Sequence, residues 1–204
     1  MKSHTSLPKS RIEAFSDGVI AILITIMVFD LKAPILVGDI PVYSEILALL
    51  PKFLSYFISF ILLSVMWVNH HQLFNLTGHI DLKILWLNMH LLFWMSLVPF
   101  ITNFIGSSPF AWQASMIYGI VFCMIAAAFT CLRLYLVRHT LLLNETQKLE
   151  HRSRIYLNQV VMGSYAVASA LSLVSVYCSW VIFFLTPVLY FIPQKVKINF
   201  TSSI

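Results

Sequence analysis

Charge is scarce in this sequence. Only 10% of its 204 residues are charged, while 59% are apolar and the mean hydropathy is +0.86. Soluble domains usually contain about 25% charged and about 45–50% apolar residues, so this composition excludes an ordinary soluble domain. Several runs exceed the ~20 apolar residues that cross the ~30 Å hydrocarbon core of a bilayer. The sequence is therefore that of an integral membrane protein.

Cysteines are few and odd in number. Cys123, Cys131 and Cys178 all lie inside apolar runs, and no C-x-x-C motif is present. This pattern excludes a disulfide framework, and we expect the three residues to be small buried hydrophobic side chains. The sequence also lacks a polar stretch long enough for a soluble domain. We therefore expect residues 1–204 to form a single transmembrane domain.

The apolar runs predict an all-α membrane protein with six transmembrane helices per subunit. The expected spans are 12–31, 45–69, 82–105, 110–136, 155–176 and 178–193. Turn residues follow the first span at Ala33-Pro34 and the third at Gly106. Residues 155–193 are divided because they are too long for one crossing. The polar stretch 139–154 is expected to be a connector, in which Asn144-Glu145 begins a short helix.

The basic residues are distributed unevenly over this arrangement. Every lysine and arginine except Lys32 and Lys52 falls on one side of the six spans. The positive-inside rule places that side, and with it both termini, in the cytoplasm. Termini on the same side require an even number of spans, which agrees with six. Topology thus explains the net charge of +5, and we expect membrane lipid rather than nucleic acid as a partner.

Polar residues crowd the start of the first span. Ser10 to Glu13 has the S-x-x-E form of a capping box, which predicts that Ser10 caps the helix and that Glu13 bonds back to the Ser10 amide. Ser16 and Asp17 lie more than a turn further along. Because a carboxylate in a membrane helix is costly unless it faces protein or water, we expect Asp17 to meet donors on other helices. The candidate donors are Trp67, Asn69, His70, His71, Asn88 and His90.

One stripe of the first span combines a basic residue, two aromatic residues and several small or aliphatic ones. At about 100° per residue, this face contains Arg11, Phe15, Gly18, Ile22, Thr25, Ile26 and Phe29. One interpretation is ordinary helix packing or contact with lipid. The other is that copies of this helix surround an axis and form an apolar constriction that excludes water. Spacing alone does not decide between them.

The start of the first span resembles a known signature. Arg11-x-x-x-Phe15-Ser16-Asp17, followed by Gly-Val-Ile-Ala-Ile, is similar to the R-x-x-x-F-S-D motif of the transmembrane-protein-175 family of potassium channels. The resemblance extends to the six-span layout with internal termini. It implies a leak-type channel selective for potassium, which is not an enzyme and needs no cofactor. The single repeat implies a homotetramer of the prokaryotic type, located in the plasma membrane.

The resemblance also implies roles for individual residues. The first helix of each subunit would line a central pore, with Ile22 as the gate and the neck that determines selectivity. The further layers of the pore would be Thr25, Ile26 and Phe29, of which Phe29 departs from the family's usual aliphatic residue. A structural network would lock this helix onto the second and third. Its expected members are Arg11, Phe15, Ser16, Asp17, Trp67, Asn69, His70 and Asn88.

No potassium-filter motif of the T-V-G-Y-G type is present, so we expect selectivity to arise without a ring of filter carbonyls. A narrow apolar neck predicts modest selectivity and leak-like conduction instead.

Two other functions compete with the channel. The first is a membrane enzyme or redox protein that uses His70, His71 and His90. Adjacent histidines on a helix point about 100° apart and no H-x-x-x-H pair is present, so we expect no metal site and favour a hydrogen-bonding network that titrates near neutral pH. The second is a proton-coupled transporter. It would need an ionisable group near the membrane midplane, whereas Asp17 and Asp30 lie near opposite ends of the first span.

Overall fold

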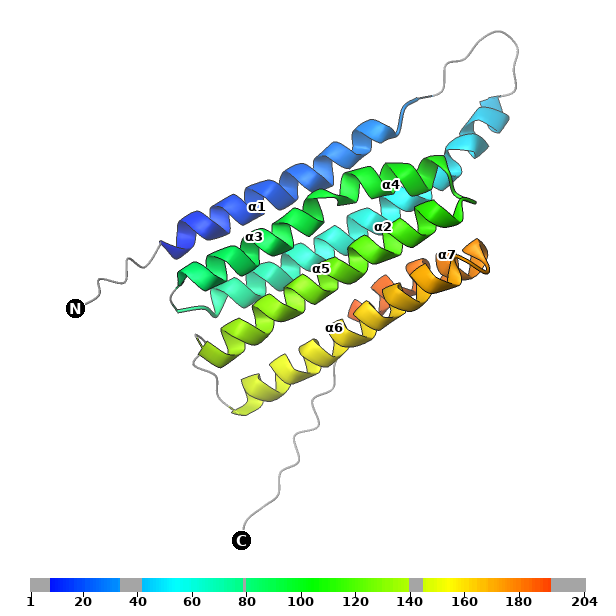
Figure 1. Cartoon of the computed structure of the whole chain (residues 1–204). Coiled ribbons are helices and arrows are strands. Elements are labelled where there is room, and N and C mark those ends of the chain that lie inside the picture. Colours follow the sequence, from blue (N-terminus) through cyan, green and yellow to red (C-terminus); the bar gives the residue numbers. More distant parts are fainter. Residues whose placement is uncertain (1–7, 34–41, 79, 140–144, 192–204) are drawn as a thin grey trace, which may run out of the picture.

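The chain folds into helices that run back and forth along one another (Figure 1). The computed structural model describes residues 8–33, 42–78, 80–139 and 145–191. The helices are α1 Lys9–Ile26, η1 Met27–Asp30, α2 Val42–Asn75, α3 Leu82–Ser96, α4 Val98–Ser107, α5 Trp112–His139, α6 Glu145–Leu171, α7 Val176–Leu185 and η2 Thr186–Tyr190. The predicted all-α fold class is confirmed.

These elements form six helical columns in the described part of the chain, because η1 continues α1, α4 continues α3 and η2 continues α7. Successive columns alternate in direction. Helices α1, α3 and α6 begin at one end of the bundle, where α2 and α5 finish (Figure 1). We call this the basic end, since Lys9, Arg11, Lys83 and Arg138 lie there, and the other the distal end. The positive-inside rule predicts that the basic end faces the cytoplasm.

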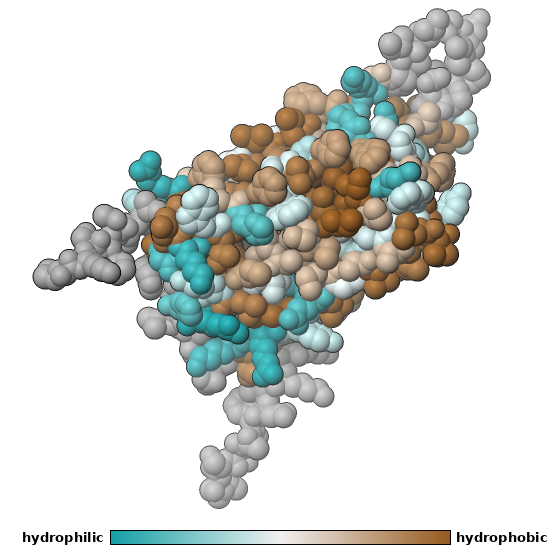
Figure 2. Space-filling view, viewed as in Figure 1, coloured by the Kyte–Doolittle hydropathy of each residue, from teal (hydrophilic) through white to brown (hydrophobic). Residues whose placement is uncertain are grey.

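The surface agrees with a membrane setting. Among the residues that the structure describes, four columns are long and apolar enough to cross a bilayer by themselves: Lys9–Asp30, Ile46–Asn75, Leu82–Ser107 and Trp112–His139. The column Val176–Tyr190 is apolar but shorter. In Figure 2 apolar side chains cover much of the visible face, and hydrophilic ones gather mainly toward the basic end.

Several helix boundaries differ from the expected spans. Helix α2 continues to Asn75 rather than ending at residue 69, because the polar side chains of Asn69 and His70 find partners on neighbouring helices. Helix α6 begins at Glu145, so much of the expected connector is helical. An ion pair of 3.0 Å between Arg154 and Glu150, one turn apart, supports this polar first part of α6.

The predicted capping box is wrong. Helix α1 starts at Lys9, with Pro8 before it at φ −59° and no side-chain cap, so Ser10 already lies inside the helix. Proline is pre-organised for a helix start because its ring fixes φ in the helical range. Glu13 faces Lys9 at 3.6 Å instead of returning to Ser10. Lys9 also donates to the carbonyl of Asn75 at 3.1 Å, which ties the start of α1 to the end of α2.

The third column is broken between α3 and α4. Pro99 has no N–H to continue the helical ladder, and Leu97 turns its own N–H back to the carbonyl of Trp94 at 3.3 Å. The expected single span 82–105 is therefore two rods in line. Both rods touch α1, α3 along its basic half and α4 along its distal half.

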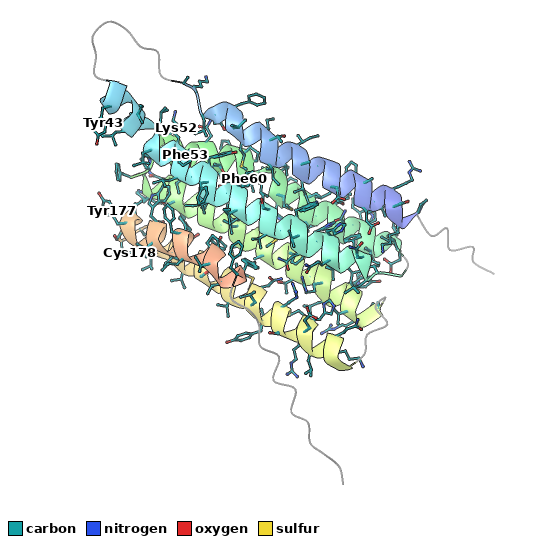
Figure 3. The ribbon with its side chains drawn as sticks, turned by 180° about the vertical axis from the view of Figure 1, so that it is seen from behind. Tyr43, Lys52, Phe53, Phe60, Tyr177 and Cys178 are labelled. Carbon is teal, nitrogen blue, oxygen red and sulfur yellow. The ribbon has the colours of Figure 1, made fainter. Side chains whose placement is uncertain are left out.

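Helix α5 packs most closely against α6. A Cβ atom on Gly119 would lie 2.2 Å from the Ser169 hydroxyl and 3.0 Å from the Tyr165 carbonyl, so only glycine allows this approach. The cysteines are less buried than expected: Cys131 and Cys178 are exposed, and Figure 3 shows Cys178 beside Tyr177 at the distal end of α7. In a membrane an apolar side chain can face lipid at little cost, which explains the difference.

Candidate functional site

Helix α1 has two contrasting faces. Its buried side chains are Ile12, Ser16, Ile20 and Leu23, and Met27 of η1 continues the same face. The opposite face is exposed along its whole length. Its members are Arg11, Phe15, Gly18, Ile22, Thr25, Ile26 and Phe29. Ile22 is 61% exposed and Phe29 75% exposed, so the chain itself leaves this stripe uncovered.

A buried chain of hydrogen bonds fixes the buried face of α1 at the basic end. The amide of Asn88 on α3 donates to the hydroxyl of Ser16 at 2.8 Å, and its oxygen lies 2.8 Å from Nε2 of His70 on α2. Ser16 donates in turn to the carbonyl of Ile12 at 2.9 Å. Since an amide oxygen only accepts, Nε2 of His70 carries the proton. All three side chains are at most 2% exposed, so these bonds act in a low-dielectric interior.

Asp17 has a separate partner. Its carboxylate accepts from the indole N–H of Trp67 at 2.9 Å, and the Trp67 ring stacks on His71 with centroids 5.8 Å apart. A second contact thus joins α1 to α2, one residue after Ser16. The carboxylate is half-buried and obtains the donor on another helix that its cost in a membrane requires.

The other expected network members point elsewhere. Arg11 and Phe15 are exposed and line a groove of about 330 Å³ between α1 and α3, with Leu85 and Met89 on its other side. Asn69 donates to its own helix and accepts from the Arg154 guanidinium at 3.1 Å. The structure therefore brings together Ser16 with Asn88 and His70, and Asp17 with Trp67. It does not join Arg11, Phe15 or Asn69 to either group.

A second anchor lies at the distal end, which sequence reasoning missed. The hydroxyl of Thr102 on α4 lies 2.7 Å from that of Ser59 on α2 and 3.8 Å from the Met27 sulfur. Ser59 lies 3.0 Å from the Tyr118 hydroxyl on α5. This buried chain of polar atoms crosses four columns. Its only signal in the sequence is a pair of polar residues, Thr102 and Asn103, within an apolar run.

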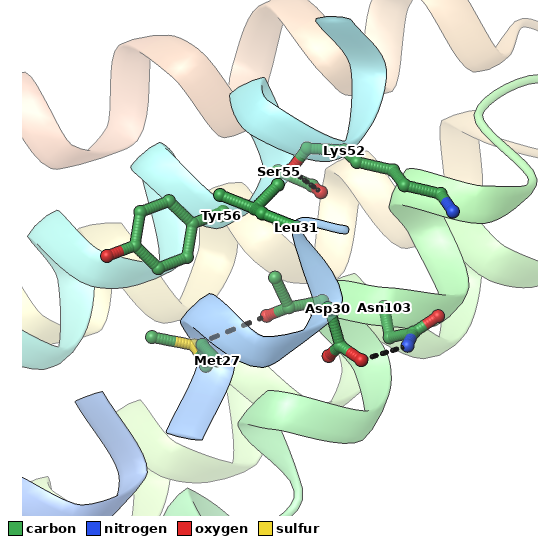
Figure 4. A pocket seen from close by; sticks show the side chains of 8 residues that line it. Met27, Asp30, Leu31, Lys52, Ser55, Tyr56 and Asn103 are labelled. Atoms are coloured by element: carbon green, nitrogen blue, oxygen red, sulfur yellow. Dashed lines mark hydrogen bonds between the residues drawn. The ribbon is translucent and has the colours of Figure 1, made fainter. Parts of the chain in front are cut away.

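Asp30 completes the distal anchor. Its carboxylate accepts from the amide of Asn103 on α4 beside a pocket of about 10 Å³, which also borders Lys52 (Figure 4). That volume suits a single water molecule. A wider groove of about 540 Å³ adjoins it, between Phe29 and Phe100. Asp30 thus holds η1 to α4 while remaining partly accessible.

The described histidines do not form a metal-binding cluster. His70 is committed to Asn88 and stacks on Phe74 with centroids 4.4 Å apart, while His71 and His90 are exposed. Among residues 8–33, 42–78, 80–139 and 145–191, no three His, Cys, Asp or Glu side chains gather as a metal site.

Comparisons with known proteins agree with the geometry. Residues 11–99 match the family model described as the endosomal/lysosomal potassium channel TMEM175, and the match begins at Arg11. A protein named potassium channel from Chryseobacterium sp. (strain P1-3) is 37% identical over 190 residues, which cover 93% of this chain and 95% of that protein. The human protein named endosomal/lysosomal proton channel TMEM175 is 35% identical over 83 residues, 35% of this chain and 16% of its own length.

A solved structure has the same fold. The crystal structure of a lysosomal potassium-selective channel TMEM175 homolog from Chamaesiphon minutus superposes with a TM-score of 0.78 at 34% identity, over 89% of this chain and 95% of that chain. The family and these relatives are ion channels, which confirms that the chain is not an enzyme. On its helical architecture, its Ser16 and Asp17 contacts and these similarities, the chain belongs to the TMEM175 family of potassium channels.

Proposed function

We propose that four copies of this chain form a potassium channel in the plasma membrane of a prokaryote, with α1 of each copy lining the central pore. The observation that carries the proposal is the uncovered apolar stripe on α1, opposite a face that is anchored at both ends. A helix held in this way presents its free side reproducibly to other copies. Relatives named potassium channels, matched over nearly their whole length, support the potassium assignment.

In the proposed pore, Ile22 forms the narrowest ring. Four aliphatic side chains around an axis make a neck that water leaves readily, so an ion must shed part of its hydration to pass. Potassium holds its water less tightly than sodium does, so its partial dehydration costs less free energy. The backbone of α1 and η1 is helical from Lys9 to Asp30, so its carbonyls serve the helix rather than a filter ring.

The remaining layers follow the same face toward the distal end. Thr25 turns its hydroxyl back to the carbonyls of Ala21 and Ile22, at 2.9 and 3.0 Å, and so offers only weak polarity to a passing ion. Ile26 and Phe29 continue the apolar lining. Arg11 and Phe15, which face outward at the basic end, are proposed to contact the neighbouring copy rather than the network of their own chain. Potassium is the permeant ion and no cofactor takes part.

Ion flux from proteoliposomes tests this function. We expect the wild type to pass potassium faster than sodium, and Ile22→Asn to raise both fluxes and lower their ratio, because an amide wets the neck. Val181→Asn is the matched control, since Val181 is 57% exposed on α7, away from the proposed pore, and its flux should equal that of the wild type.

Two further measurements complete the test. A pH-sensitive dye inside the liposomes shows whether protons follow the same path, since the human relative is named a proton channel. The mass of the detergent-solubilised protein should correspond to four chains of 23.3 kDa. Equal flux through Ile22→Asn and Val181→Asn would place the gate elsewhere, and a monomer or dimer would exclude the proposed assembly.

A further inference from the structure

Within the described part of the chain, Arg133 on α5 is a buried cation without a carboxylate partner. Its side chain is 2% exposed, and Nε has no hydrogen-bond partner among the described residues. One Nη atom lies 3.5 Å from Nδ1 of His151, and the guanidinium lies 5.0 Å from the centroid of the Phe129 ring. Arginine stays protonated even when buried, so a full positive charge lies between α5 and α6.

Glu150 interacts electrostatically with Arg133, but it is already paired with another arginine. Glu150 binds Arg154, which donates to the same carboxylate oxygen from Nε at 3.1 Å and from Nη2 at 3.0 Å. That pair is neutral as a unit. His151 accepts from Arg133 through Nδ1, so its imidazole is neutral in this contact and cannot serve as the counter-charge. A buried charge without compensation is strongly destabilising, so the unbalanced charge of Arg133 calls for a counter-charge.

A second unused donor is linked to Arg133 through Tyr190. Asn158 on α6 is 3% exposed, and its Nδ2 also lacks a partner within the described ranges. Its oxygen accepts from the Tyr190 hydroxyl of η2 at 3.4 Å, and Tyr190 in turn interacts electrostatically with Arg133. Asn158 follows His151 by two helical turns, so both face α5. Arg133 of α5, Asn158 of α6 and Tyr190 of η2 thus form one linked group of polar side chains.

We propose that Arg133 and Asn158 bind a small monovalent anion of the chloride type between α5, α6 and η2. Both unused groups are donors, which suits an anion and not a cation. One negative charge is enough to balance Arg133, because Arg154 is already neutralised by Glu150. Water would satisfy the two donors but would leave the positive charge of Arg133 unbalanced. A phosphate group is bulkier and carries more charge than this enclosed cluster requires.

Thermal unfolding of the purified protein in detergent tests the site without any flux measurement, so its outcome is independent of the proposed pore. We expect the wild type to unfold several degrees higher in potassium chloride than in potassium gluconate at equal ionic strength, because an anion that binds only the folded state stabilises it. The effect should saturate with chloride concentration. Bromide should replace chloride and give an anomalous diffraction peak beside Arg133.

Three variants separate a specific site from a general salt effect. Arg133→Gln should lose the chloride dependence, whereas Arg138→Gln, which removes an exposed arginine from the same helix, should keep it. Asn158→Asp supplies a fixed carboxylate, so it should be as stable in gluconate as the wild type is in chloride, and insensitive to chloride. This last variant decides the matter if Arg133→Gln fails to fold.

Several results would overturn the proposal. An unfolding temperature of the wild type that does not respond to chloride would indicate water at the cluster. The same response in all variants would indicate a general salt effect. Stabilisation by inorganic phosphate or by phosphatidylglycerol bicelles, but not by chloride, would assign the cluster to a phosphate group instead.

Discussion

The two ends of α1 are held by different chemistry. At the basic end, Asn88 joins Ser16 to His70 in a dry network in which the amide uses both its oxygen and its nitrogen. At the distal end, Thr102 meets the weakly accepting sulfur of Met27, and Asp30 is held at a partly accessible site. The strength of a polar contact depends on burial and on how completely its groups are satisfied. We therefore expect the basic end to be the firmer of the two.

The largest effect is expected from breaking the basic anchor. Asn88→Leu removes a donor and an acceptor at once, which leaves Ser16 and His70 buried without their partner. Each such loss costs about 1–3 kcal/mol, so the free energy of unfolding should fall by about 3 kcal/mol. Denaturant titration in detergent measures it. Asn103→Leu, the matched change at the distal end, should cost less than half as much, and an equal cost would remove the distinction between the ends.

A smaller effect is expected from Thr102→Val. The substitution keeps the shape of the side chain and removes its hydrogen bond to Ser59, which still has the Tyr118 hydroxyl. The free energy of unfolding should fall by about 1 kcal/mol, a typical value for one hydrogen bond. Thr25→Val serves as the control in the same titration, because that exposed hydroxyl bonds only to its own helix. Destabilisation by Thr25→Val of equal size would show that hydroxyl loss alone, and not the anchor, is responsible.

The smallest effect is expected from Asp30→Asn. An amide can still accept from Asn103, so only the contribution of the charge is lost, about 0.5 kcal/mol at a partly accessible site. Thermal unfolding at low and high salt measures this contribution, which should shrink as salt screens it. A loss comparable to that of Asn88→Leu would show that the distal end is held as firmly as the basic end.

Much of α1 could be predicted from its sequence. The helical period placed residues from Arg11 to Phe29 on one stripe, which the structure leaves exposed. The cost of a carboxylate in a membrane predicted that Asp17 needs a donor from another helix. The same period places Arg11 and Phe15 on the exposed stripe. Their expected part in the network came from the family signature, and the structure does not join them to it.

The parts that could not be predicted depend on neighbours far away in the chain. Arg133 counts toward topology like any other basic residue, and only the approach of α6 shows that it is buried. Thr102 is one polar residue in an apolar run until Ser59 and Met27 are placed beside it. Pro99 was visible, but a proline within a long apolar run does not by itself show whether the helix kinks or ends.

The break near Leu97 divides the third column into two rods that each support a different part of α1. Helix α3 is hydrogen-bonded to Ser16, and α4 contacts Met27. The break lies between these two contacts, at the level of Ile22. Because the two rods hold α1 at different places, a change in the angle between them would tilt the distal part of α1 relative to its basic part. Such a tilt would displace Ile22 relative to the basic end of the bundle while both contacts stay intact, so movement of this side chain need not cost the subunit its internal bonds.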